Sequence, residues 1–69
     1  MNDDVEAAAR VRTLLLSGDN ILKNRSAPSR LEAARSRYVE ARTVAEAAGL
    51  DDILAFVNRR IAEIGTDGS

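Results

Sequence analysis

The chain has 69 residues, 45% of them apolar and 30% charged, which fits one small folded domain and excludes a second. Ten basic and eleven acidic residues give a formal net charge of −1, which is too weak a field to attract nucleic acid over a distance. Because the chain contains neither Cys nor His, it lacks the common zinc ligands, a thiol nucleophile and an imidazole base, so we expect no catalytic residue, no metal and no cofactor.

A first helix is predicted over residues 3–23. Its apolar and small residues recur at alternating spacings of three and four, as one face of a helix requires. These residues are Ala8, Val11, Leu15, Gly18 and Leu22. Acidic residues begin the segment and Lys23 lies at its end, which suits the helix dipole. A glycine inside a helix costs about 1 kcal/mol relative to alanine, so Gly18 predicts a close crossing with a neighbouring helix.

A second helix is predicted between the cluster at residues 26–29 and Gly49. Ser26 or Ser29 is the expected N-cap, and Glu32 would complete a capping box with Ser29. The core positions follow a regular spacing of three and four and are mostly alanine, so the neighbouring helices should approach closely. They are Leu31, Ala34, Tyr38, Ala41, Ala45 and Ala48. Gly49 is expected to end the helix in the left-handed conformation.

A third helix is predicted from Asp51 or Asp52 to Gly65, with apolar residues on one face. The face consists of Leu50, Leu54, Val57, Ile61 and Ile64. Because the connections are short and no strand pattern competes, we predict an all-α fold, an antiparallel three-helix bundle. Residues 1–65 would form the single domain, and residues 66–69 a flexible C-terminal tail.

Part of this pattern resembles the tetratricopeptide repeat. Ala34, Tyr38 and Ala41 have the small–aromatic–small spacing of the second helix of that repeat. In the first predicted helix, Leu14, Gly18 and Ile21 resemble the family's large–Gly–large positions. The chain departs from the family in having Leu in place of Trp, a longer link between the helices and no later proline. In outline it is also similar to the three-helix microtubule-interacting-and-trafficking domains.

Both resemblances imply a non-catalytic adaptor that binds a peptide or a helix of a partner protein. The binding site would be a groove between the first and third helices, and the tetratricopeptide resemblance would bring Arg12, Asp19, Lys23 and Arg59 toward the ligand. Phe56 is the only phenylalanine and is predicted at the edge of the third helix's apolar stripe. Val5 and Leu16 also fall outside the core stripe. These apolar residues favour association with a partner or a second copy, so a homo-oligomer is a further possibility.

Two other functions remain open. Residues 44–60 resemble a helix-turn-helix junction, which would make the chain a DNA-associated regulator. However, Asp51 and Asp52 would begin the recognition helix and face phosphates with like charge. We therefore prefer a simple helix C-cap at Gly49. The third possibility is a docking segment or accessory subunit of a larger enzyme.

The expected location is the cytoplasm. The longest wholly apolar run is residues 14–16, far below the roughly 20 residues that span a membrane, and the acidic start is unlike a signal peptide. The absence of cysteine is compatible with a reducing compartment. The many alanines and the preference for arginine over lysine favour a bacterial source.

Overall fold

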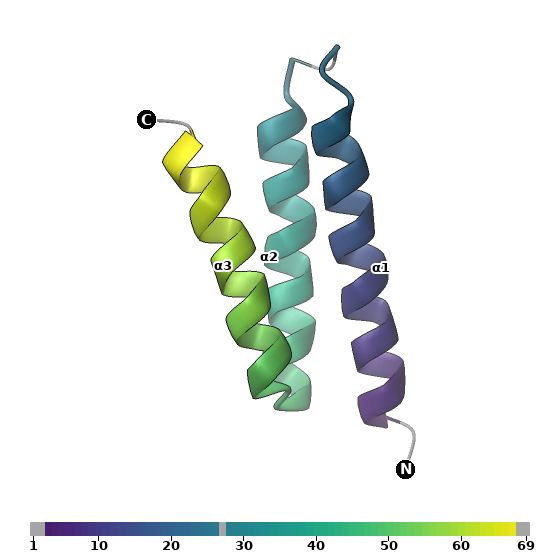
Figure 1. Ribbon diagram of the computed structural model, residues 1–69. Helices are drawn as coiled ribbons and strands as arrows, with labels where there is room; N and C mark the ends of the chain where they lie inside the picture. Colours follow the sequence, from purple (N-terminus) through teal and green to yellow (C-terminus); the bar gives the residue numbers. More distant parts are fainter. Residues whose placement is uncertain (1–2, 27, 68–69) are drawn as a thin grey trace.

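A computed structural model describes residues 3–26 and 28–67 of the chain. It contains three helices, α1 (Asp3–Lys23), α2 (Arg30–Ala48) and α3 (Asp51–Asp67). The chain runs upward through α1, downward through α2 and upward again through α3 in Figure 1, so helices adjacent in sequence are antiparallel. The predicted all-α three-helix fold is confirmed.

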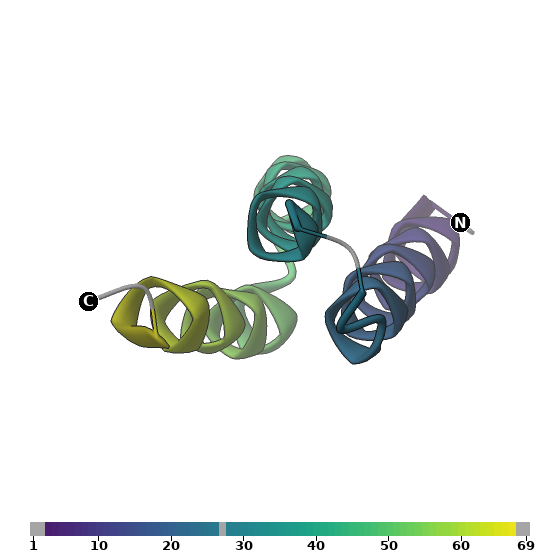
Figure 2. The same cartoon turned by 90° about the horizontal axis from the view of Figure 1, so that it is seen from above.

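The helices form two layers. Viewed from above in Figure 2, α1 and α3 lie on one side and α2 lies on the other, where it packs against both. The buried core draws on all three helices and lies on the predicted apolar faces, of which Leu22, Leu31, Leu50, Leu54 and Ile61 are only partly buried against it. It consists of Val11, Leu14 and Leu15 from α1, Ala34, Tyr38, Ala41 and Ala45 from α2, and Val57 and Ile64 from α3.

The predicted close crossing at Gly18 is confirmed. A Cβ atom added to Gly18 would lie 2.5 Å from Cε1 of Tyr38, a distance at which the ring would have to shift. The Tyr38 ring therefore occupies the space that any larger residue at position 18 would need. Since Ala34, Ala41 and Ala45 are also fully buried, small side chains bring α1 and α2 together along their length.

The turn between α2 and α3 follows the sequence prediction. Gly49 has φ 69°, in the left-handed region that favours glycine. The Leu50 N–H donates to the Ala45 carbonyl at 3.0 Å and the Gly49 N–H donates to the Glu46 carbonyl at 3.2 Å, which is the Schellman pattern. The Leu50 carbonyl then accepts from the Leu54 N–H and starts α3. The predicted end of the second helix at a left-handed Gly49 is confirmed.

Two local predictions were wrong. Ser29 is the N-cap of α2, but its side chain makes no capping hydrogen bond, because its backbone (φ −104°, ψ 25°) is outside the extended region from which a capping side chain reaches the helix. The third helix does not end at Gly65 but continues to Asp67. Residues 66 and 67 therefore belong to α3, whereas residues 68 and 69 of the predicted tail lie outside the described residues.

Candidate functional site

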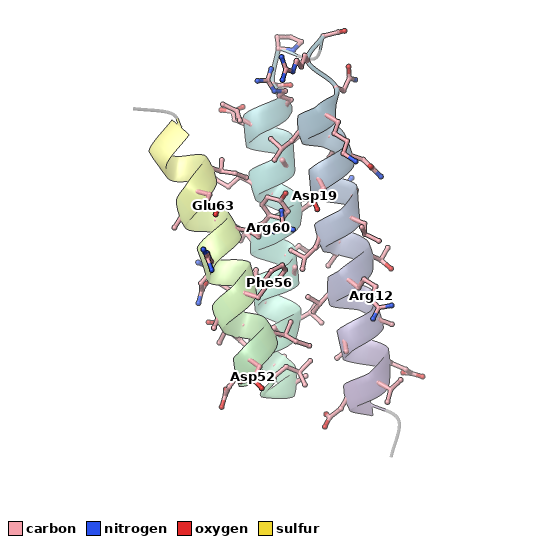
Figure 3. The ribbon with its side chains drawn as sticks, in the orientation of Figure 1. Arg12, Asp19, Asp52, Phe56, Arg60 and Glu63 are labelled. Carbon is pink, nitrogen blue, oxygen red and sulfur yellow. The ribbon has the colours of Figure 1, made fainter. Side chains whose placement is uncertain are left out.

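A groove of about 320 Å³ separates α1 from α3, and we call it the α1–α3 groove. From α1 it is lined by Ala8, Val11, Arg12, Leu15, Leu16 and Asp19. From α3 it is lined by Ile53, Phe56 and Arg60. Figure 3 looks into this groove, with Arg12 and Asp19 on α1 and Phe56 and Arg60 on α3. The groove lies where the sequence analysis predicted one, between the first and third helices.

The floor and the walls of the groove differ in exposure. Val11 and Leu15 belong to the buried core and form an apolar floor. Leu16 and Phe56 stand on opposite sides and remain 54% and 48% exposed. The predicted exposure of Leu16 and Phe56 is therefore confirmed. Large apolar side chains that stay in water on both sides of an apolar floor favour the binding of another apolar surface.

A polar cluster that joins all three helices lines one part of the groove. The Tyr38 hydroxyl of α2 donates a short hydrogen bond to Oδ1 of Asp19 on α1. Nη1 of Arg60 on α3 donates to the same oxygen at 3.1 Å. Asp19 thus accepts from both other helices, so its carboxylate connects α1 with α2 and α3.

The surroundings of Tyr38 determine what its hydroxyl can do. Burial raises the pKa of Tyr38 above its ordinary value, and the hydrogen bond to the Asp19 carboxylate raises it further. The hydroxyl consequently stays protonated near neutral pH and acts as a hydrogen-bond donor. A tyrosinate base or nucleophile is not available here, so the cluster is better suited to positioning the helices than to acid–base chemistry.

Arg60 also contacts the exposed aromatic residue of the groove. Its guanidinium carbon lies 5.1 Å from the centroid of the Phe56 ring, within the range of a cation–π interaction. Asp19 holds the same guanidinium, so Arg60 links the Asp19 carboxylate to the Phe56 ring at the groove wall. Arg60 is not among the residues predicted to bind a partner. The signal was present, because Phe56 and Arg60 are four residues apart and such residues meet on one face of a helix.

The structure brings together three of the five residues predicted for partner binding. Arg12, Asp19 and Phe56 line the α1–α3 groove. Lys23 is exposed at the end of α1 and is not among the lining residues. Arg59 is also outside the lining and forms an exposed ion pair with Glu63 at 3.9 Å, one turn further along α3. Any contact that Lys23 and Arg59 make with a ligand would come from beyond the groove itself.

Other hollows border the described residues. One lies along the second half of α1 and shares Leu16 with the groove, but its remaining lining is mostly polar: Thr13, Ser17, Asn20, Ile21 and Asn24. A second hollow, between the first half of α1 and the second half of α2, is bordered by Asp4, Glu6 and Arg10 but by none of the exposed large apolar side chains. Within residues 3–26 and 28–67, no three acidic side chains gather closely enough to hold a metal ion. No helix in that part of the chain combines the length and the apolarity needed to cross a membrane.

Comparisons with known proteins do not assign the chain to a family. No model of a protein family matches it, and searches of curated proteins and of solved structures find no match. Any statement about function therefore depends on the groove and its residues.

Proposed function

We propose that this chain is a non-catalytic protein–protein interaction module whose α1–α3 groove binds a peptide or a helix of a partner protein. The observation that supports this most directly is the pairing of Leu16 and Phe56 across an apolar floor, with both side chains about half exposed. A folded domain gains nothing from leaving these side chains in water, whereas a ligand that covers them gains about 25 cal/mol for each Å² of apolar area buried.

The proposed mechanism is the insertion of an apolar anchor of the partner between α1 and α3. Phe56 is the central contact, because it is the aromatic side chain of the groove and remains about half exposed beside Arg60. Arg12 makes no ion pair with the described residues and lies at the border of the groove, where it would select for a carboxylate on the ligand. Asp19 is already held by Tyr38 and Arg60, so its role is to maintain the width of the groove.

The resemblance to the tetratricopeptide repeat is consistent with a site between α1 and α3, but the proposal depends on the groove and not on the resemblance. In that family the ligand lies against first-type helices of successive repeats, which would correspond to α1 and α3 here. On the side of α2 that faces away from the groove, the charged residues Glu32, Arg35 and Glu46 are exposed. A charged chain without cysteine would suit the predicted cytoplasmic, bacterial setting. We prefer this function to DNA regulation, since Asp51 and Asp52 are exposed in the first turn of α3 and would repel phosphates.

The test is capture of a partner that depends on the groove. Tagged wild-type protein, a Phe56→Ala variant and a Val5→Ala variant are each incubated with nuclease-treated lysate, and the bound proteins are identified by mass spectrometry. Val5 is also an exposed apolar residue but does not line the groove, so it controls for nonspecific stickiness. We expect a protein retained by the wild type and by Val5→Ala but lost by at least about tenfold with Phe56→Ala, because aromatic anchors commonly contribute 2 kcal/mol or more.

Two outcomes would contradict the proposal. Equal retention by wild type and Phe56→Ala, with helical circular dichroism unchanged, would show that binding does not use the groove. Salt-sensitive retention of labelled DNA duplex at sub-micromolar concentration would favour the regulator instead.

A further inference from the structure

Phe56 separates the α1–α3 groove from a second hollow, which lies on α3 alone. This second hollow has a volume of about 190 Å³, and we call it the outer hollow. It is lined by Phe56, Arg59, Arg60 and Glu63. Because Phe56 and Arg60 line both hollows, a ligand that covers the exposed Phe56 ring from the groove also reaches the outer hollow. Arg59, which the groove lining does not include, therefore lies beside the same ligand.

Positive charge is concentrated around Phe56, although the whole chain has a net charge of −1. Two arginines and one acidic residue line the groove, and two arginines and one acidic residue line the outer hollow. The hollow between α1 and α2 instead has two acidic residues and one arginine, and a hollow at the turn between α2 and α3 has two aspartates and no basic residue. The hollow along the second half of α1 has no charged side chain. Of these five hollows, the two that share Phe56 are the ones with an excess of positive charge.

Two arginines of this region are available to a ligand. Arg12 is exposed on α1 and makes no ion pair with the described residues. Arg59 on α3 has a single ion pair, at 3.9 Å, and its side chain is 81% exposed, so that pair contributes little and can exchange for another carboxylate. Each helix of the groove thus offers one available cation, next to the exposed apolar side chains of Leu16 and Phe56.

The shape of the groove favours a helical ligand. In Figure 2, α2 packs against α1 and α3 from one side, so a helix on the opposite side would complete a four-helix arrangement. The groove extends along α1 from Ala8 to Asp19, which is about 16 Å or three helical turns. An extended peptide would leave main-chain N–H and C=O groups unpaired over the apolar floor, because α1 and α3 use theirs within their own helices. A helical ligand pairs these groups itself.

We propose that the ligand of the α1–α3 groove is an amphipathic helix with acidic residues on both flanks of its apolar face. Its apolar side chains cover Leu16 and Phe56. Its carboxylates pair with Arg12 on one flank and, across the Phe56 ring, with Arg59 on the other. This partner chemistry rests on the proposed function, which by itself requires only that a peptide or a helix binds in the groove.

The first experiment compares three synthetic peptides that differ only in charge. Each has about 18 residues, enough to form a helix, with leucines on one face and glutamates, lysines or glutamines on both flanks of that face. Fluorescence anisotropy measures the binding of each labelled peptide at about 0.05 M salt, where exposed charges are weakly screened. We expect the glutamate peptide to bind about tenfold or more tightly than the lysine peptide, with the glutamine peptide between them.

The charge of the whole chain makes this order informative. Because the net charge is −1, a general attraction would favour the lysine peptide, and only the local arginines favour the glutamate peptide. Phe56→Ala should weaken the binding of the glutamate peptide by about tenfold, since both flanks of the ligand meet at this ring.

The second experiment reverses the two available charges. Arg12→Glu with Arg59→Glu should invert the order, so that the lysine peptide binds more tightly than the glutamate peptide. Arg35→Glu with Arg37→Glu on α2 is the matched control, because it changes the net charge equally. Like Arg12, Arg35 is exposed and makes no ion pair with the described residues, and Arg37, like Arg59, has one surface ion pair at 3.9 Å. The control should still prefer the glutamate peptide, and both variants should retain helical circular dichroism, since all four arginines are exposed.

The contrary outcomes separate the partner chemistry from the proposed function. Equal binding of the glutamate and lysine peptides, lost with Phe56→Ala, would overturn the acidic helix and leave the function supported. Inversion of the order by the Arg35 and Arg37 control would overturn it too, because overall charge alone would then decide. If no peptide binds but Phe56-dependent capture from lysate succeeds, the partner is not an acidic helix; if both fail, the function is also wrong. A wild type that binds no peptide and doubles its mass in light scattering, but not with Phe56→Ala, would identify a second copy as the occupant.

Discussion

The α1–α2 hairpin and α3 are packed in different ways. Between α1 and α2 the contacts involve glycine and alanine, and the Tyr38 ring fills the space that a Cβ on Gly18 would occupy. On α3, the core side chains are branched aliphatic residues, Val57 and Ile64, and most of the helix contacts α2 alone. Figure 1 shows α3 leaning away from α2 toward its C-terminal end.

This difference explains why the groove lies where it does. Small residues let two helices approach to the short end of the usual 8–10 Å spacing and leave no room between them. Larger side chains hold α3 further out, and among the described residues the Arg60–Asp19 pair is the ion pair that joins it to α1. The hairpin is therefore the more closely packed part of the domain, and the position of α3 sets the width of the α1–α3 groove.

The largest expected effect comes from overfilling the hairpin. Ala41 is fully buried in α2, so Ala41→Leu should lower the free energy of unfolding by about 1–3 kcal/mol. The same substitution at Ala55, which is exposed on α3, should change it by less than about 0.5 kcal/mol. Urea denaturation of both variants measures the difference. Equal midpoints would show that α2 does not pack as closely as its alanines indicate.

Alkaline titration tests Tyr38, whose hydroxyl donates to the Asp19 carboxylate that also binds Arg60. Because folding raises the pKa of Tyr38, the folded state holds the phenolic proton more tightly than the unfolded state does. This tighter proton binding contributes fully to the free energy of unfolding below the ordinary tyrosine pKa of about 10. As pH rises above that value, the free energy of unfolding falls by up to about 1.4 kcal/mol per pH unit. We expect urea midpoints to fall between about pH 9 and about pH 11 in the wild type and less in Tyr38→Phe.

A direct optical measurement supports this titration. Tyr38 is the only tyrosine, so the ultraviolet absorbance of tyrosinate reports on this residue alone. The native protein should titrate well above the midpoint found in concentrated urea. If the two midpoints coincide, Tyr38 is not buried against Asp19.

Arg59 and Arg60 are neighbours on α3 and form ion pairs of different kinds, one at the surface with Glu63 and one partly buried with Asp19. The side chains of Arg60 and Asp19 are 35% and 25% exposed and their atoms lie 3.1 Å apart, whereas those of Arg59 and Glu63 are 81% and 64% exposed and 3.9 Å apart. Arg60→Met should cost about 1 kcal/mol, and Arg59→Met less than about 0.5 kcal/mol. Urea denaturation measures both. A larger loss with Arg59→Met would mean that the Asp19 bridge does not hold α3.

The sequence predicts features that depend on local spacing. The helix periodicity, the left-handed Gly49 and the exposure of Phe56 all follow from residues within a few positions of one another. The spacing of three and four along α2 also identified the residues that the structure buries there, which are Ala34, Tyr38, Ala41 and Ala45. These predictions succeed because a helix fixes the direction of each side chain relative to its near neighbours.

The bridge could not be predicted in the same way. Asp19 is 19 positions from Tyr38 and 41 positions from Arg60 along the chain, and a periodic pattern does not state how one helix is rotated against the next. Consequently Arg59, the arginine predicted for partner binding, lies outside the groove lining, whereas Arg60, one position and therefore about 100° further around α3, lines it. Lys23 was also placed toward the ligand, but the groove lining on α1 extends no further than Asp19.

The smallest expected effect concerns a local pattern that the structure does not use. Ser29 and Glu32 have the spacing of a capping box, but the Ser29 side chain makes no capping hydrogen bond. Ser29→Ala should therefore change the free energy of unfolding by less than about 0.5 kcal/mol, below the roughly 1 kcal/mol typical of a working N-cap. A loss of about 1 kcal/mol or more in urea denaturation would show that the cap forms in solution. In that case the start of α2 would be fixed by its own sequence, whereas an unchanged midpoint would indicate that packing of α2 against α1, through residues such as Ala34, keeps the first turn in place.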